Sequence, residues 1–134
     1  MKILFIDDNP LGKVTPIIEY CKHQQIDFSY EIVQSVNSAI KYIFSNLNEI
    51  DLIVSDLGLP RYDDGSDYGI LNGLDILDEL IRKNVTIPII INSTTDIPNL
   101  RKYADLNTPI NQRFYYVPSL DGFLLKNYIK KYFK

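Results

Sequence analysis

Two groups of aspartates follow two short apolar segments of the chain. Asp7 and Asp8 come directly after residues 3–6, and Asp56 comes directly after residues 52–55. Short apolar runs bounded by turn residues are typical of buried parallel strands, and ligands bind beyond the carboxyl ends of such strands in an open sheet. Three carboxylates gathered there repel one another unless a cation joins them. The pattern therefore predicts a site for a hard divalent ion with oxygen ligands, above all Mg²⁺.

Each acidic group also has an ordinary structural interpretation. Asp7 and Asp8 could cap a first helix that begins just after them, and Asp56 could be a loop residue ahead of a turn that contains Gly58. Either group alone would favour these interpretations. Their combination at the ends of neighbouring strands favours the metal site.

The elements that must position these acids are visible as alternating patterns. Apolar runs of strand length occur at residues 3–6, 28–33, 52–54, 87–91 and 114–117. Apolar residues at helical spacing occur between and after them, over residues 17–26, 36–47, 74–81 and 120–133, with a weak pattern at 97–104. Strands that alternate with helices predict an α/β fold, with a doubly wound parallel sheet covered by helices on both faces.

Composition limits the classes of protein that remain. A chain of 134 residues with 46% hydrophobic and 23% charged residues fits one globular domain over residues 1–134. The net charge of −3 argues against a nucleic-acid partner, which needs a basic face. Cys21 is the single cysteine and His23 lies in a polar stretch, so neither a disulfide, a zinc cluster nor a histidine-based hydrolase is expected. Without a secretory or membrane-spanning pattern, the cytoplasm is the expected compartment and no membrane partner is expected.

The order and spacing of these motifs resemble the receiver domain of bacterial two-component response regulators. The segments that carry the resemblance are residues 3–8, 56–60, 73–77 and 88–94. The likeness extends over essentially the whole chain. It implies a flavodoxin-like (βα)5 fold with strand order 2-1-3-4-5, and a site at the ends of strands one, three, four and five.

The resemblance also implies a role for each site residue. Asp56 matches the carboxylate that accepts a phosphoryl group from a sensor histidine kinase or a phosphotransfer protein. Asp7 and Asp8 match the acidic pair that binds Mg²⁺ together with Asp56, and Gly58 matches the residue whose carbonyl oxygen binds the same ion. Ser93 matches the hydroxyl that senses the phosphoryl group, although its neighbours carry hydroxyls as well. Such a protein is a signalling domain and not an enzyme.

One position departs from the family pattern. Receiver domains normally end strand five with a lysine that reaches the phosphoryl group, and Val117 stands at the corresponding position here. Two hypotheses follow. Asp56 is still phosphorylated with Mg²⁺, with Lys13 or Arg61 from a flanking loop supplying the charge, or the chain is a pseudo-receiver that binds a protein partner regardless of phosphate. Retention of all three acids favours the first.

The segment at residues 61–72 is longer than in the usual receiver domain. It is rich in Asp, Gly, Ser and Tyr, which predicts an exposed, turn-rich segment over the acidic site. A lid, a partner contact and a solvated insertion are all compatible with it. Its acidic residues lack the closing Glu of a calcium loop.

The resulting expectation is a stand-alone receiver domain that signals through protein–protein contact. Receiver domains often pair near strand five and the last helix, so a homodimer is one expectation, although the weak pattern at 97–104 argues against the usual pairing. Two enzyme or cofactor classes are less compatible. Aspartyl phosphatases carry a D-x-D pattern after the first strand, whereas Asp7 and Asp8 are adjacent here. An FMN binder needs a Gly/Ser/Thr-rich phosphate loop at the same place, where this chain has acids.

Overall fold

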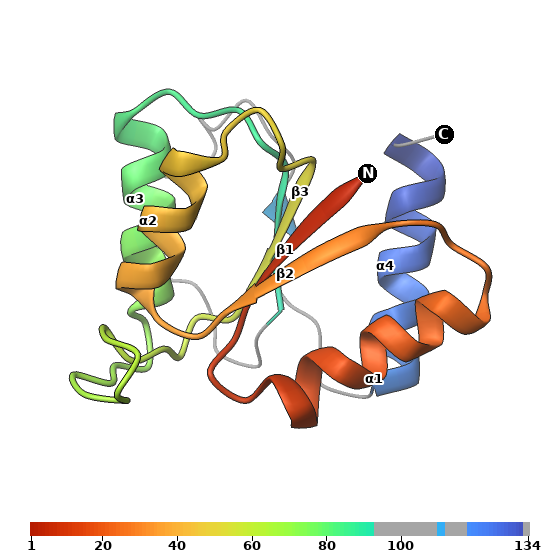
Figure 1. The fold of residues 1–134 in the computed structure, drawn as a ribbon, viewed down its shortest axis with the longest axis horizontal. Helices are drawn as coiled ribbons and strands as arrows, with labels where there is room; N and C mark the ends of the chain where they lie inside the picture. The colour runs from red at the N-terminus through yellow and green to blue at the C-terminus, as the bar shows by residue number, and fades with distance from the viewer. Residues whose placement is uncertain (93–109, 112–117, 133–134) are drawn as a thin grey trace.

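The computed structural model describes residues 1–92, 110–111 and 118–132, and Figure 1 shows their arrangement. Strands and helices alternate along the first two thirds of the chain. In chain order the elements are β1 (Lys2–Ile6), α1 (Pro10–His23), β2 (Ser29–Val33), α2 (Val36–Ser45), β3 (Leu52–Ser55), α3 (Gly73–Arg82), β4 (Ile89–Ile91), β5 (Ile110–Asn111) and α4 (Pro118–Tyr132).

The strands form one sheet in the order β2-β1-β3-β4-β5, and every neighbouring pair is parallel. This order and the alternation with helices make the fold flavodoxin-like, as predicted. The fifth strand was expected at residues 114–117, which lie outside the described residues. Within the described residues, β5 is Ile110–Asn111, where Ile110 lies opposite Ile89 of β4.

Helices cover both faces of the sheet. In Figure 1, α2 and α3 lie on one side of the strands, and α1 and α4 lie on the other. Successive strand residues point to opposite faces, so Leu4 and Ile6 of β1 pack toward α2 and α3, whereas Ile3 and Phe5 pack toward α1 and α4. All four of these side chains are fully buried. Burial on both faces explains why the central strands read as continuous apolar runs.

The predicted helices agree with the described ones except at their ends. Residue 26 had been included in the apolar face of the first helix, but α1 ends at His23, and Gln25 has a φ of 61°. The second predicted helix extends to Leu47, whereas α2 ends at Ser45 and Leu47 is exposed. The weak pattern at residues 97–104 lies outside the described residues. Within the part of the chain that is described, no helix is long and apolar enough to cross a membrane.

Candidate functional site

Backbone pairing places the two acidic groups side by side at one edge of the sheet. Ile6, the last residue of β1, lies opposite Ser55, the last residue of β3. The pairing continues one residue further, because the backbone N–H of Asp56 donates to the carbonyl of Ile6 (2.9 Å). On the other side of β1, the N–H of Asp7 donates to the carbonyl of Val33 (3.0 Å). The acids are therefore held on rigid strand ends.

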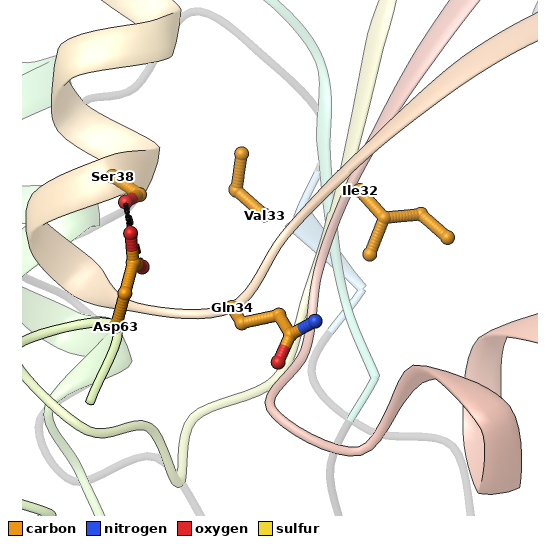
Figure 2. Close-up of a pocket in the computed structure, with 5 residues that line it drawn as sticks. All are labelled: Ile32, Val33, Gln34, Ser38 and Asp63. Atoms are coloured by element: carbon orange, nitrogen blue, oxygen red, sulfur yellow. Dashed lines mark hydrogen bonds between the residues drawn. The ribbon is translucent and has the colours of Figure 1, made fainter. Parts of the chain in front are cut away.

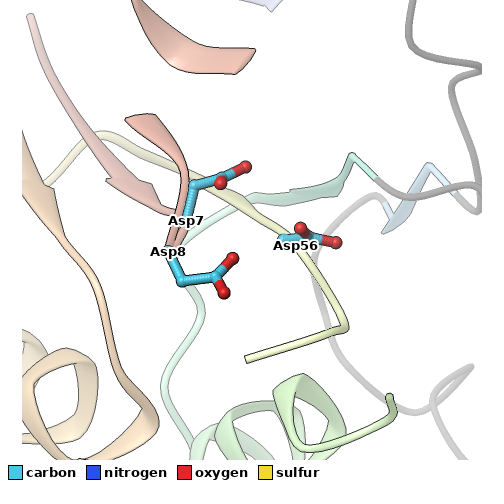
Figure 3. A group of neighbouring side chains, drawn as sticks. All are labelled: Asp7, Asp8 and Asp56. Carbon is cyan, nitrogen blue, oxygen red and sulfur yellow. The ribbon is translucent and has the colours of Figure 1, made fainter. Parts of the chain in front are cut away.

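The three predicted metal ligands come together there. One carboxylate oxygen from each of Asp7, Asp8 and Asp56 lies within 4.8 Å of the other two, and Figure 3 shows the side chains at the ends of β1 and β3. Asp7 is 2% exposed and Asp56 is 5% exposed, whereas Asp8 faces solvent. Two of the three carboxylates are thus largely removed from water, where a charge without a partner is costly.

Burial shifts the acidity of Asp7. Removal from water raises the pKa of this carboxyl from 3.8 to about 6, against the opposing effect of a hydrogen bond from the N–H of Asn9 (2.8 Å). The negative charges of Asp56 and Asp8 raise it further, and Lys13 lowers it. Asp7 therefore favours the neutral form more than an ordinary carboxylate does, and a nearby cation would favour its ionised form.

A lysine pairs with the predicted phosphoacceptor. The ammonium of Lys13, on the first turn of α1, lies 2.7 Å from Oδ2 of Asp56, while Oδ1 of Asp56 accepts the N–H of Leu57 (2.7 Å). Burial alone lowers the pKa of Lys13, but the hydrogen bond and charge of Asp56 outweigh it and the pKa is raised. Of the two cations suggested by the sequence, Lys13 therefore reaches the site. Arg61 pairs instead with Asp75 of α3 (2.7 Å).

The donor set fits a hard divalent cation. Carboxylate and carbonyl oxygens are the ligands that Mg²⁺ prefers, at about 2.0–2.1 Å, so two opposite ligands lie roughly 4.2 Å apart. One oxygen from each of the three acids lies within 4.8 Å of the others, which is close to this spacing. Gly58, the expected carbonyl donor, is buried in the turn directly after Asp56. Water can complete the coordination, since Asp8 is open to solvent.

Two further predicted residues cannot be placed. Ser93, the expected phosphoryl-sensing hydroxyl, and Val117, at the expected lysine position, both lie outside the described residues. The first described stretch of the chain ends at Asn92, which follows β4, is 5% exposed, and donates its N–H to the carbonyl of Ser55 (2.8 Å). A buried amide side chain at this strand end was not predicted, although a polar residue directly after the apolar run 89–91 is the signal that could have indicated it.

The segment at residues 61–72 is a compact turn next to this site. Leu59, just before the segment, and Gly69 form an antiparallel bridge and exchange both backbone hydrogen bonds (3.2 Å each). Further along, the N–H of Arg61 donates to the carbonyl of Ser66 (3.1 Å). Residues 62–68 are exposed, as expected. The segment is therefore hydrogen-bonded to itself and is more ordered than its composition indicated.

Asp63 fixes this segment to the start of α2. Its carboxylate accepts hydrogen bonds from the hydroxyls of Ser35 and Ser38, each at 2.7 Å, and Ser35 is also the N-cap residue of α2. These hydroxyls, that of Ser38 first, lower the pKa of Asp63. Figure 2 shows the contact with Ser38 at the rim of a cavity of about 360 Å³. The lining residues are Ile32, Val33, Gln34, Ser38 and Asp63. This cavity does not include the three acids, and the sequence did not predict it.

The segment also touches the turn expected to bind the metal. Gly58 packs so closely against the Tyr68 hydroxyl and the Ile70 carbonyl that a Cβ at this position would collide with the hydroxyl. Tyr68 itself is otherwise exposed. Residues 61–72 are thus joined to α2 through Asp63, to α3 through Arg61, and to the candidate site through Tyr68.

Solved structures with the same arrangement of elements are response regulators and their receiver domains. The phosphorylated cyanobacterial phytochrome response regulator RcpA is 21% identical, with a TM-score of 0.71 over 96% of this chain and 91% of that one. The Mn²⁺-bound response regulator Rcp1 is 19% identical, with a TM-score of 0.69 over 98% and 92%. The receiver domain of HemR from Leptospira biflexa, in a non-phosphorylated form, is 20% identical, with a TM-score of 0.66 over 99% and 95%.

The chain has the receiver-domain fold. No protein-family model matches its sequence, and no curated protein matches it either. The likeness therefore resides in the arrangement of β1–β5 and the helices, at identities near 20%. Within this receiver fold, the acids of this chain occupy the carboxyl edge of the sheet, where α/β folds bind their ligands.

Proposed function

We propose that this chain is a receiver domain, spanning residues 1–134, that accepts a phosphoryl group on Asp56 with Mg²⁺ bound nearby. The observation that carries the proposal is the meeting of Asp7, Asp8 and Asp56 at the ends of β1 and β3 in a receiver fold. The phosphoryl donor is a sensor histidine kinase or a phosphotransfer protein. The expected compartment is the cytoplasm.

Three acids and one carbonyl would hold the metal. Asp7, Asp8 and Asp56 supply carboxylate oxygens, and Gly58 supplies its backbone oxygen. The ion, when bound, offsets negative charge on the acids and on the incoming phosphoryl oxygens. Burial, and then the charges of Asp56 and Asp8, raise the pKa of Asp7, and a divalent cation would favour its ionised form.

The transfer step uses the carboxylate of Asp56 as the nucleophile. One carboxylate oxygen forms a bond to phosphorus, while the bond between phosphorus and the donor's nitrogen breaks and its electron pair stays on that nitrogen. The product is an acyl phosphate on Asp56 and a donor imidazole. The main-chain pairing of Asp56 with Ile6 and the hydrogen bond from Leu57 hold the carboxylate in a fixed place for in-line attack. Ser93 is proposed to donate its hydroxyl to a phosphoryl oxygen after transfer.

Apolar side chains beside the site support docking of a protein donor. Leu11 on the first turn of α1, and Tyr68 and Ile70 of the 61–72 segment, are large apolar residues that are mostly exposed. Large exposed apolar side chains around a polar centre are typical of protein–protein contacts. Signal output is likewise proposed to be a protein contact, with self-association as one form of it.

The proposal is tested by intact mass after incubation with acetyl phosphate and Mg²⁺. Wild type is expected to gain the mass of one phosphoryl group, and Asp56→Asn is expected to gain none. Omission of Mg²⁺, with a chelator present, is expected to abolish the gain in wild type. An unmodified wild-type protein, under conditions where Mg²⁺ binding is confirmed by calorimetry, would refute phosphoryl acceptance.

A second function is favoured by one observation. Asp56 has a cation of the chain itself as a partner, because the ammonium of Lys13 lies 2.7 Å from its carboxylate. A site filled in this way is also compatible with a pseudo-receiver that binds a protein partner without phosphate. That function predicts equal partner binding by wild type and Asp56→Asn, whereas phosphoryl signalling predicts that the variant no longer responds to the donor.

A further inference from the structure

One ion pair joins the acidic site to α1. Among the ion pairs of residues 1–92, 110–111 and 118–132, only Lys13–Asp56 involves one of the three clustered acids. The ammonium contacts Oδ2 of Asp56, which is the oxygen of that carboxylate not bound by the N–H of Leu57. Lys13 therefore occupies the side of Asp56 that is otherwise free to react or to bind a cation.

Charge balance requires a cation beyond the metal once phosphate arrives. Three ionised carboxylates are neutralised by one divalent ion and one ammonium together. Conversion of Asp56 into an acyl phosphate replaces its single negative charge with about two, so the loaded site is short of positive charge even with Lys13 present. Without Lys13 it would carry one further uncompensated charge, in surroundings where Asp7 and Asp56 are nearly inaccessible to water.

We propose that Lys13 is an exchangeable cation of the phosphoacceptor site. It pairs with Asp56 when the metal is absent, yields the carboxylate to the metal, and then binds an oxygen of the phosphoryl group. The second half of this assignment rests on the proposed phosphoryl acceptance by Asp56. Lys13 is thus a phosphate-binding residue supplied by α1.

The local structure permits such an exchange. The backbone of Lys13 is fixed, because its N–H donates to the carbonyl of Asn9 (3.1 Å) in the first turn of α1. Its side chain is 32% exposed, so the end of the four-carbon stem can move along the rim of the site without displacing the helix. An ammonium also suits an exchanging role, since its three donors rotate and need no fixed planar geometry.

The experiment compares Lys13→Met with Lys13→Arg and wild type. Lys22→Met serves as the control, because it removes an exposed lysine from the same helix, away from the acids. Three quantities are measured at pH 8: the Mg²⁺ dissociation constant by calorimetry, the melting temperature with and without Mg²⁺, and the rate of phosphoryl gain from acetyl phosphate by intact mass. The rate is measured with Mg²⁺ saturating for each variant.

Removal of the Lys13 charge is expected to strengthen Mg²⁺ binding and to slow phosphoryl gain. Lys13→Met should bind Mg²⁺ about three- to tenfold more tightly, because the ammonium no longer competes for Asp56 or repels the ion. Its phosphoryl gain should be about tenfold slower, because a cation facing the phosphoryl oxygens is lost. Its melting temperature should fall without Mg²⁺, where Asp56 is left buried and unpaired, and should be restored by Mg²⁺. Lys13→Arg keeps the charge but not the rotating ammonium, so its values should lie between those of wild type and Lys13→Met.

The outcomes separate this inference from the function on which it rests. Unchanged metal affinity and unchanged phosphoryl gain in Lys13→Met would overturn the inference, as would a parallel loss of both, which indicates structural damage. An effect of equal size in Lys22→Met would overturn it too. If wild type binds Mg²⁺ but gains no phosphoryl group, the proposed function fails, and tighter Mg²⁺ binding by Lys13→Met would still establish that Lys13 competes with the metal for Asp56.

Discussion

Two aspartates of this chain stand in opposite electrostatic situations. Asp7 directly follows β1, is buried beside other carboxylates, and has its pKa raised to about 6. Asp63 lies on the exposed 61–72 segment, accepts hydrogen bonds from Ser38 and Ser35, and has its pKa lowered. The same side chain is therefore costly to ionise at one place and favoured in its ionised form at the other.

The difference indicates what each region is built for. The hydroxyls of Ser35 and Ser38 donate hydrogen bonds to the Asp63 carboxylate. These bonds hold the 61–72 segment against the start of α2. Asp7, by contrast, is buried beside Asp8 and Asp56, and the structure describes one hydrogen bond to it, from the N–H of Asn9. Sites of this kind gain from binding a cation, and perturbed acidity is typical of functional positions.

The largest expected effect is on metal binding by Asp7→Asn. The amide keeps the shape of the side chain and can still accept the N–H of Asn9, but it removes one charged ligand. We expect Mg²⁺ affinity to fall about 100-fold, or about 2.7 kcal/mol, as measured by calorimetry. Asp63→Asn is the matched control and should bind Mg²⁺ as wild type does. An equal loss in both variants would contradict the distinction between the two regions.

Gly73→Ala is expected to disturb the junction where both regions meet. Gly73 begins α3, donates its N–H to the carbonyl of Leu57 (2.8 Å), and lies so close to the backbone of Asp56 and Leu57 that a Cβ would collide with it. Because backbone cannot turn aside as a side-chain end can, we expect a loss of about 2 kcal/mol in the free energy of unfolding by urea. Lys83→Ala, exposed at the other end of α3, should change it little.

The third prediction concerns the pH dependence of the metal-free protein. Because its pKa is raised, the Asp7 carboxyl binds its proton more tightly in the folded state. Its contribution to the free energy of unfolding is therefore complete below pH 3.8 and is lost as pH rises through about 6. The shift corresponds to about 3 kcal/mol at most, and relaxation of the site should reduce this to about 1.5 kcal/mol. Urea unfolding in a chelator, at several pH values, measures it. Asp7→Asn should remove this part of the pH dependence, and an unchanged profile would refute the assignment.

The smallest expected effect is at Asp63. Asp63→Asn weakens the bonds to Ser35 and Ser38, and we expect the free energy of unfolding to fall by about 0.5–1 kcal/mol, because the contact is exposed. Since the pKa of Asp63 is lowered, its contribution to the free energy of unfolding is present above pH 3.8 and is lost as pH falls through the folded-state pKa. Faster proteolysis within residues 61–72 would report local release. Asp64→Asn, on the same segment but bonded only to Ser66 among the hydrogen bonds described, is the comparison.

Much of the receiver fold could be predicted from the sequence, because its signals are local. The apolar runs that became β1 and β3 and the helical spacing of α3 each depend on residues close together in the chain. The predicted second helix extends beyond the observed end of α2 at Ser45, because Leu47 continues the apolar spacing. Burial of a face, and not its sequence pattern alone, decides where a helix ends.

The candidate site was predicted as a set of acids but not as an electrostatic arrangement. Asp7, Asp8 and Asp56 were identified because each follows a strand, and parallel strand ends share one edge of the sheet. That Lys13 rather than Arg61 would pair with Asp56 could not be read from the chain, since both are near in sequence to an acidic group. The bonds from Asp63 to α2 join residues 25 and 28 positions apart and carry no local signal.

The sequence by itself determined where β1–β4 and α1–α4 lie, apart from their ends, and which acids would meet, because periodicity and strand ends are properties of short segments. Only the tertiary structure decided which acids are buried and which cation accompanies them. Those depend on how α1 crosses β1 and how the 61–72 segment folds against α2, and thus on packing between distant parts of the chain. Burial and pairing are what shift the pKa of Asp7 upward and that of Asp63 downward.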